Sequence, residues 1–126
     1  MTPRKIRKRV RTLIWLLVLV FGCPSSVFIV ADVACNISIN TWLPIYPGAK
    51  QISVDYNFIR PRGMGATLMT FETPDDPETV EQFYYNHFVD LVQQKIPRGL
   101  GGTDFSAEPN PNGEGSLLAL YSHCVL

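Results

Sequence analysis

Histidine and cysteine are scarce in this chain, and their scarcity narrows the chemistry that it can perform. Its 126 residues include two histidines, His87 and His123, and three cysteines. No Cys-x-x-Cys pair, His-x-x-x-His pair or Gly-x-Ser-x-Gly motif occurs. The material for a zinc site, for a serine hydrolase site or for histidine acid–base catalysis is therefore thin. We expect no catalytic residues, no metal and no cofactor, and hence a protein that is not an enzyme.

Acidic residues are absent before Asp32, although the whole chain is neutral with 11 basic and 11 acidic residues. From Asp32 onward, 5 basic and 11 acidic residues give a net charge of −6. A folded part with this charge would repel phosphate, which argues against nucleic acid as a partner. Six basic residues lie instead within the first eleven positions: Arg4, Lys5, Arg7, Lys8, Arg9 and Arg11.

Charge of either sign is missing from residues 12–31, which follow this basic cluster. A helix of 20 residues is about 30 Å long, which matches the hydrocarbon core of a bilayer. The basic flank should stay in the cytoplasm by the positive-inside rule. We therefore expect a cytoplasmic N-terminus (1–11), a transmembrane anchor (12–34) and an extracytoplasmic domain (35–126) of a single-pass protein in the cell membrane.

The residues around Cys23 leave two alternatives to a retained transmembrane anchor. Val20-Phe21-Gly22-Cys23 resembles a bacterial lipobox, in which the cysteine is acylated, and cleavage as an ordinary secretory signal is the second alternative. Phenylalanine stands where lipoboxes carry a small residue, and Pro24 follows the cysteine. These departures favour a retained anchor. Serine hydroxyls after Pro24 can hydrogen-bond backbone carbonyls that a proline leaves free.

Alternating polar and apolar residues after the anchor predict strands. The pattern is clean over residues 36–40 and over residues 51–59, where Ile52, Val54, Tyr56 and Phe58 share a face. Glycines and a proline follow, and residues 66–73 supply another apolar run. We expect a strand at 36–40, and an antiparallel hairpin formed by the two later runs.

A helix is predicted from Pro77 to about Gln94. Asp76 is suited to be its N-cap, and Pro97 and Gly99 cannot continue it. The apolar residues recur at three- and four-residue spacing and should pack on the sheet: Val80, Phe83, Tyr84, Phe88, Leu91 and Val92.

Two further strands are predicted near residues 103–106 and 116–125, joined by a turn at Asn112-Gly113. Residues 117–121 are apolar enough for a strand covered on both sides. The fold class is therefore α+β: one N-terminal transmembrane helix, then a small antiparallel sheet with a single helix on one face.

A disulfide between Cys35 and Cys124 is predicted because both lie outside the apolar segment, in a compartment that permits oxidation. Cys35 is in phase with Ile37 and Ile39 of the expected first strand, and Cys124 is in phase with Leu118 and Leu120. The bridge then requires the first and last strands to be neighbours. Two separate buried thiols are the alternative.

Two motifs resemble a small module of uncharacterised bacterial membrane-anchored proteins and lipoproteins. One is the turn Tyr46-Pro47-Gly48-Ala49, and the other is the helix start with the pattern Asp-x-Pro-Glu-x-Val-x-x-Phe-Tyr, which ends at Phe83-Tyr84. The resemblance covers residues 44 to about 88. It implies an extracytoplasmic accessory module and carries no catalytic residues.

Arg60 and Arg62 flank a proline in the first hairpin, where two exposed guanidinium groups would contact an anion or a partner's carboxylate. A solvated turn is the alternative. Trp42 and Tyr46 follow the apolar segment and suit either the membrane interface or packing under the sheet.

Taken together, these features predict a membrane-anchored extracytoplasmic module that binds or stabilises a membrane or envelope protein. The lipid bilayer is its other expected partner. Two alternatives remain: an accessory subunit of a larger integral-membrane complex, held through its transmembrane helix, and a membrane-tethered enzyme with an unrecognised site.

Overall fold

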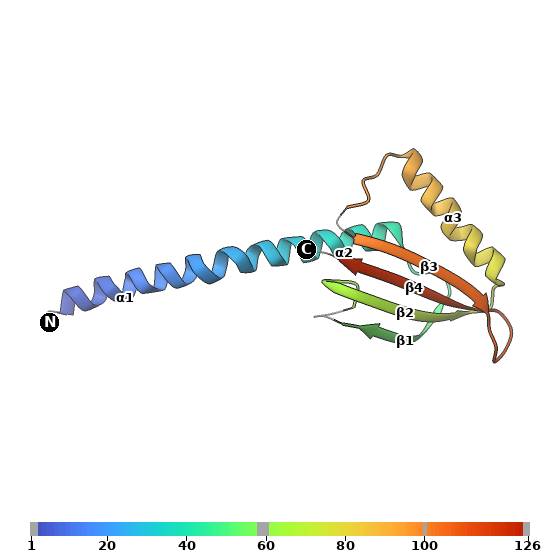
Figure 1. Cartoon of the computed structure of the whole chain (residues 1–126), viewed down its shortest axis with the longest axis horizontal. Coiled ribbons are helices and arrows are strands. Elements are labelled where there is room, and N and C mark those ends of the chain that lie inside the picture. The colour runs from blue at the N-terminus through green and yellow to red at the C-terminus, as the bar shows by residue number, and fades with distance from the viewer. Residues whose placement is uncertain (1–2, 58–60, 100, 125–126) are drawn as a thin grey trace. The chain divides into compact units, whose positions relative to one another are not determined.

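The computed structural model describes residues 3–57, 61–99 and 101–124, with side chains from Val10 onward (Figure 1). The chain divides into two compact units, Met1–Ala31 and Asp32–Leu126. Helix α2 (Cys23–Trp42) contributes residues to both.

The first unit is helical. It consists of α1 (Pro3–Leu17), the π-helical turn η1 (Val18–Gly22) and the first residues of α2. Every side chain from position 10 to position 30 is exposed. The helix over Val10–Trp42 is long and apolar enough to cross a membrane. The uncharged run thus lies within a helix of the length and composition that a membrane span requires.

The turn before Pro24 shows how the helix accommodates a proline. The hydroxyl of Ser25 donates a hydrogen bond to the carbonyl of Phe21, and that of Ser26 donates to the carbonyl of Cys23 at 2.8 Å. The π-helical turn η1 ends at the residue before Cys23. Serine hydroxyls therefore bond to backbone carbonyls around the proline, as the sequence predicts.

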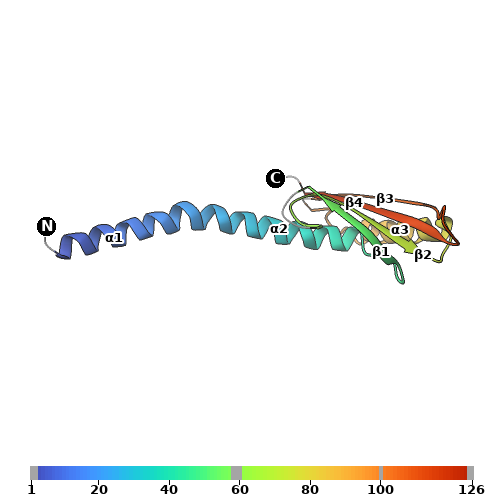
Figure 2. The ribbon, with the colours of Figure 1, turned by 90° about the horizontal axis from the view of Figure 1, so that it is seen from below.

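The second unit is built on a four-stranded antiparallel sheet. Its strands are β1 (Lys50–Tyr56), β2 (Gly65–Thr73), β3 (Gly101–Pro109) and β4 (Ser116–Cys124), in the order β1-β2-β4-β3. Helix α3 (Pro77–Gln93) lies on one side of this sheet (Figures 1 and 2). The α+β fold class and both predicted hairpins are confirmed.

Helix α3 begins as the sequence predicts. The carboxylate of Asp76 accepts a hydrogen bond from the backbone N–H of Thr79 at 3.0 Å, and Pro77 occupies the first turn. The pKa of Asp76 is lowered, chiefly by the hydrogen bond from the Thr79 hydroxyl and then by the Thr79 backbone N–H. The cap therefore holds a carboxylate at the positive end of the helix.

The prediction of a strand at residues 36–40 is wrong, because these residues belong to α2. Cys35, Ile39 and Trp42 recur at helical spacing and are buried, whereas Ile37 is 63% exposed. Asn40 donates to the Asn36 side chain one helical turn earlier. Five alternating residues fit a helix as well as a strand, and here packing against the end of β4 selects the helix.

The core between α3 and the sheet confirms most of the predicted stripe. Val80 and Tyr84 are fully buried and Leu91 is nearly so, while Phe83 and Phe88 are partly buried against the same cluster. Val92 is 65% exposed, because it follows Leu91 and lies about 100° away around the helix.

Strand β1 departs from its predicted pattern at one position. Its pairing with β2 shifts between Gln51 and Ser53, and Ile52 within this bulge is 54% exposed. Val54 still packs against the core, whereas Tyr56 is 53% exposed. Phe58 lies outside the described residues.

Candidate functional site

The face of the sheet opposite α3 is covered by no described helix. Alternate residues of β2 and β4 are buried toward α3, so their neighbours in the chain point the other way. We call this surface the open face. Its side chains are Lys50, Ser53 and Asp55 on β1; Ala66, Leu68, Thr70 and Glu72 on β2; Asp104, Ser106 and Glu108 on β3; and Leu117, Ala119, Tyr121 and His123 on β4.

The register of the strands arranges these side chains in rows across the sheet. One row runs through Lys50, Glu72, Leu117 and Glu108, so that Lys50 lies directly opposite Glu72. The next contains small side chains, Ser53, Thr70, Ala119 and Ser106. The third runs through Asp55, Leu68, Tyr121 and Asp104. The open face therefore has a strip of small residues between two rows that each carry a pair of carboxylates.

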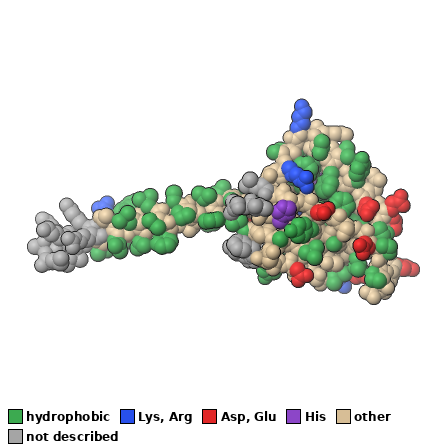
Figure 3. Space-filling view, in the orientation of Figure 1, with side chains coloured by type: hydrophobic (Ala, Val, Ile, Leu, Met, Phe, Trp, Pro, Cys, Tyr) green, Lys and Arg blue, Asp and Glu red, His purple; other side chains and the backbone are tan. Residues whose placement is uncertain are grey.

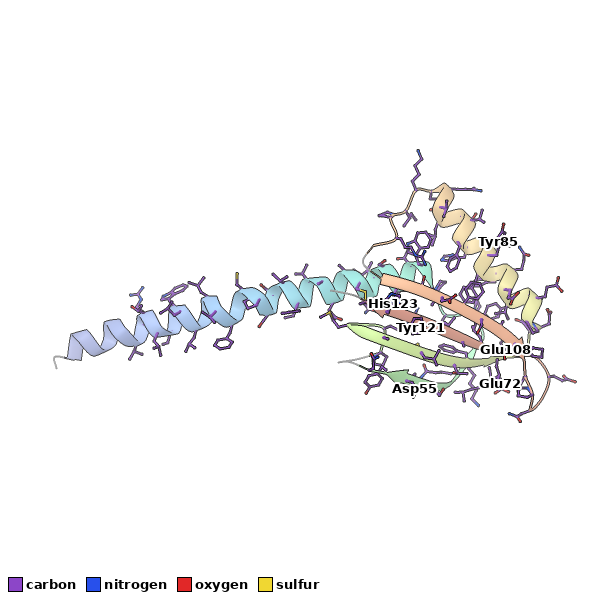
Figure 4. All side chains as sticks on the ribbon, in the orientation of Figure 1. Asp55, Glu72, Tyr85, Glu108, Tyr121 and His123 are labelled. Atoms are coloured by element: carbon purple, nitrogen blue, oxygen red, sulfur yellow. A yellow bond between two sulfur atoms is a disulfide. The ribbon has the colours of Figure 1, made fainter. Side chains whose placement is uncertain are left out.

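The charge of the open face is negative. Asp55, Glu72, Asp104 and Glu108 are all exposed, and Lys50 is the one Lys or Arg that the described ranges place among them. Figure 3 shows acidic side chains over the sheet with hydrophobic ones between them. Figure 4 places Asp55, Glu72, Glu108 and Tyr121 over the strands and Tyr85 on α3.

Apolar surface accompanies these charges. Leu68 is 40% exposed and Tyr121 is 42% exposed. Both border a hollow of about 250 Å³ that is lined by Asp55, Tyr56, Asn57, Ala66, Leu68 and Tyr121. An aromatic ring and an aliphatic side chain thus lie beside the exposed carboxylate of Asp55 in a shallow depression, which is a composition suited to contact with another macromolecule.

The sheet edges are less available than the open face. The bulge in β1 interrupts its regular ladder. On β3, Arg98 donates to the carbonyl of Thr103 at 3.2 Å, and the N–H of Phe105 donates to the Asp104 carboxylate at 2.9 Å. Bulges and side chains that bond to edge groups hinder the addition of a further strand.

A second hollow, of about 580 Å³, lies at the start of α3 and is lined by Tyr46, Asp76, Glu78, Thr79, Gln82, Phe83 and Asn86. The Tyr46 hydroxyl donates to the Asp75 carboxylate at 2.7 Å. This hydrogen bond, with burial and the charge of Asp75, raises the pKa of Tyr46 to about 12. Gln82 donates to Asn86 at 2.8 Å. The polar groups around this hollow hydrogen-bond to one another. We therefore assign them a structural role at the start of α3.

The two histidines lie apart on different elements. His87 on α3 is hydrogen-bonded through Nε2 to the carbonyl of Thr41 at 2.7 Å. His123 lies on the open face against Gly102, where a Cβ would come within 2.0 Å of its ring. Neither histidine lines the two hollows described above. Within residues 3–57, 61–99 and 101–124, no group of three or more His, Cys, Asp or Glu side chains is placed to hold a metal.

The expectation of an exposed guanidinium at Arg62 is wrong. Arg62 is 7% exposed, and its guanidinium donates to the carbonyl of Leu43. Its backbone N–H donates to the Thr67 hydroxyl at 2.7 Å, and burial lowers its pKa. The loop folds inward because this side chain bonds to the segment after α2. Arg60 lies outside the described residues.

Trp42 and Tyr46 pack within the domain, which decides between the two placements that the sequence left open. Both are 8% exposed. The indole N–H of Trp42 donates to the carbonyl of Pro97 at 3.2 Å, and the Arg98 guanidinium lies 5.9 Å from the indole ring. They thus help to attach the end of α2 and the segment after it to α3 and the following loop.

The predicted disulfide between Cys35 and Cys124 is present. Its setting differs from the prediction, because Cys35 lies on α2 rather than on a strand beside β4. The two cysteines form a small core cluster with Ile39. Cys23 is an exposed free thiol, and its lipidation stays a prediction.

Comparisons with known proteins do not identify this chain. No protein-family model, no curated protein and no solved structure matches it. The resemblance to bacterial envelope modules therefore stays a prediction that rests on the two motifs in the sequence.

Proposed function

We propose that this protein is a single-pass membrane protein whose C-terminal domain lies outside the cytoplasm and binds another membrane or envelope protein. The Cys35–Cys124 disulfide is the main support for the location outside the cytoplasm. Structural disulfides persist in oxidising compartments and are rare in the cytosol. Cys35 follows the uncharged segment by only a few residues, so the disulfide and the apolar helix together favour an N-in, C-out orientation.

The open face supports a binding role for the domain. It combines exposed Leu68 and Tyr121 with four carboxylates, and it spans all four strands. A stable antiparallel sheet can leave one face to solvent, but that face is then mostly polar. Here aromatic and aliphatic side chains are exposed on the two central strands, β2 and β4, as in the core of many protein interfaces.

Protease treatment of intact cells tests the orientation. We expect the outer domain to be digested and a small fragment containing the basic segment and the apolar helix to remain protected. Cleavage of the basic N-terminus from outside would contradict the orientation. An intact mass that lacks the first 22 residues and carries acyl chains would show instead that Cys23 is a lipidated N-terminus.

The helix itself favours a second candidate, an accessory subunit held within a larger membrane complex. The π-helical turn η1 ends at Gly22, and the small residues Cys23, Ser25 and Ser26 follow it, all exposed. Small residues allow transmembrane helices to approach closely. Replacing residues 1–34 by a cleavable secretory signal separates the candidates: a partner that still co-purifies favours the domain, and a lost partner favours the helix.

A further inference from the structure

We propose that the open face binds a segment of a partner protein that is rich in lysine and arginine. This inference rests on the proposed function of the domain as a binding module. It specifies the surface used and the chemistry of the partner.

The distribution of charge is the first support. Asp55 and Asp104 lie in one row of the open face, and Glu72 and Glu108 lie two rows away. Each of the four side chains is exposed. Lys50 offsets one charge, so the described residues of this face carry net negative charge. Complementary charge on a partner raises its association rate and selects against wrong partners.

The spacing of the rows suits long basic side chains. Along a strand, four residues span about 13 Å, and neighbouring strands are about 4.8 Å apart. The two carboxylate rows are therefore about 13 Å apart, with the small side chains of Thr70, Ala119 and Ser106 between them. A segment lying over this small strip could extend lysine or arginine side chains toward both rows.

Apolar groups on the open face can pack against the same side chains. The stems of lysine and arginine are aliphatic, and their charged heads are attracted to aromatic rings. Leu68 and Tyr121 are partly exposed within the row that carries Asp55 and Asp104. A basic side chain can therefore bury its stem on these two residues and place its cation beside a carboxylate.

Other occupants fit this face less well. A second copy bound open face to open face would bring two sets of four carboxylates together. Anionic lipid and nucleic acid would meet the same repulsion. The bulge in β1 and the side-chain hydrogen bonds at the edge of β3 disfavour addition of a partner's strand. A basic protein segment is the occupant that these charges and edges favour.

Zero-length cross-linking with a water-soluble carbodiimide tests the proposal, because this reagent joins carboxylates to lysine amines in direct contact. The full chain in membranes of its native cells is treated, and adducts are mapped by mass spectrometry. The test variant is Asp55→Asn/Glu72→Gln/Asp104→Asn/Glu108→Gln. The control, Glu78→Gln/Glu81→Gln/Asp90→Asn/Glu114→Gln, removes the same charge from exposed positions off the open face.

Because the test variant lacks the carboxylates that the reagent activates, its partner binding is read from light-induced adducts of a photo-cross-linking residue at Tyr121, which should be at least tenfold weaker than in the control. In the unsubstituted chain and in the control, we expect a carbodiimide adduct between an open-face carboxylate and a partner lysine. In the unsubstituted chain, 0.5 M salt added before the reagent should weaken it several-fold, which keeps the test valid if the variant folds poorly. A carbodiimide adduct that resists salt, or light-induced adducts that survive in the test variant or fall equally in both variants, would overturn the proposal.

The photo-cross-linking residue at Tyr121 also separates this proposal from the broader one. Light-induced adducts at position 121 that persist both in the test variant and in 0.5 M salt would show a partner on the open face that is not basic, which overturns the inference and leaves the binding function standing. Absence of both kinds of adduct would contradict the binding function of this face as well.

Discussion

The Cα atoms of Cys35 on α2 and Cys124 at the end of β4 lie 6.1 Å apart although 89 positions separate them in the sequence. The disulfide between them joins the segment that enters the domain to the last described residue of the sheet. Ile39, one turn along α2, is buried beside it. Both ends of the domain are thus fixed at the same point, which limits fraying of β4 and of α2.

Removal of this bridge should destabilise the domain strongly. In the loop-entropy model, a cross-link that closes about 90 residues contributes roughly 4–5 kcal/mol. We expect Cys35→Ala/Cys124→Ala to lower the free energy of unfolding by about that amount, measured by denaturant unfolding of the full chain in detergent. Cys23→Ala is the matched control and should change nothing, since Cys23 is exposed and unbridged. Equal stability of the double variant would show that the bridge is dispensable.

Three consecutive aromatic residues on α3 should differ sharply in how much they contribute to the stability of the domain. Tyr84 is fully buried and donates to the carbonyl of Pro44 at 2.8 Å, Phe83 is partly buried, and Tyr85 is 64% exposed. Truncation of a buried aromatic costs about 3–5 kcal/mol, and exposed substitutions usually cost within about 0.5 kcal/mol. We expect Tyr84→Ala to lose the most stability, Phe83→Ala less and Tyr85→Ala almost none. Any other order of melting temperatures would refute the assigned orientation of α3.

The hydrogen bond from Tyr46 to Asp75 predicts a loss of stability at alkaline pH. The pKa of Tyr46 is raised from 10.0 to about 12, first by this hydrogen bond. Since the folded state favours the neutral phenol, its contribution is present below pH 10 and is lost as pH rises through about 12. We expect Tyr46→Phe to cost about 1 kcal/mol at pH 8, and the difference from the unsubstituted chain to shrink above pH 10. Tyr85→Phe is the control. A difference that stays constant from pH 8 to pH 12 would argue against the hydrogen bond.

The elements with strong local signals were predictable from the sequence. Asp76 and Pro77 mark the start of α3 because capping depends on neighbouring residues alone. The hairpins likewise follow from short apolar runs around turn residues. The end of α2 was not predictable, because Ile37 and Ile39 alternate as in a strand, and only the packing of Cys35, Ile39 and Trp42 reveals the helix.

The candidate site was harder still to predict from the sequence, because it depends on which face of the sheet the helix covers. The apolar run at 117–121 predicts a strand covered on both sides, yet Tyr121 is 42% exposed. Apolar residues on both faces of β4 give no local sign of which face α3 will cover. Arg62 shows the same limit: a basic residue between proline and glycine is typical of a solvated turn, and its bond to Leu43 depends on a segment 19 residues earlier.

The turn between β3 and β4 contains a pair of glycines that should respond very differently to substitution. Gly115 has φ of +86°, and a Cβ there would lie 2.0 Å from the carbonyl oxygen of Thr73. Gly113 has no atom closer than 3.8 Å to such a Cβ, and that atom is the side-chain nitrogen of Asn110. Because backbone must move to admit the new methyl group, Gly115→Ala should cost at least about 2 kcal/mol.

Gly113→Ala, the matched control in the same turn, should leave the melting temperature of the full chain nearly unchanged. The backbone of Thr73 cannot yield easily, since Thr73 is buried and pairs with Ser116 on β4. The strain should therefore appear at this end of the β2–β4 ladder, as faster amide hydrogen exchange at Ser116. If Gly115→Ala and Gly113→Ala melt at the same temperature, the close approach of this turn to β2 does not exist in solution.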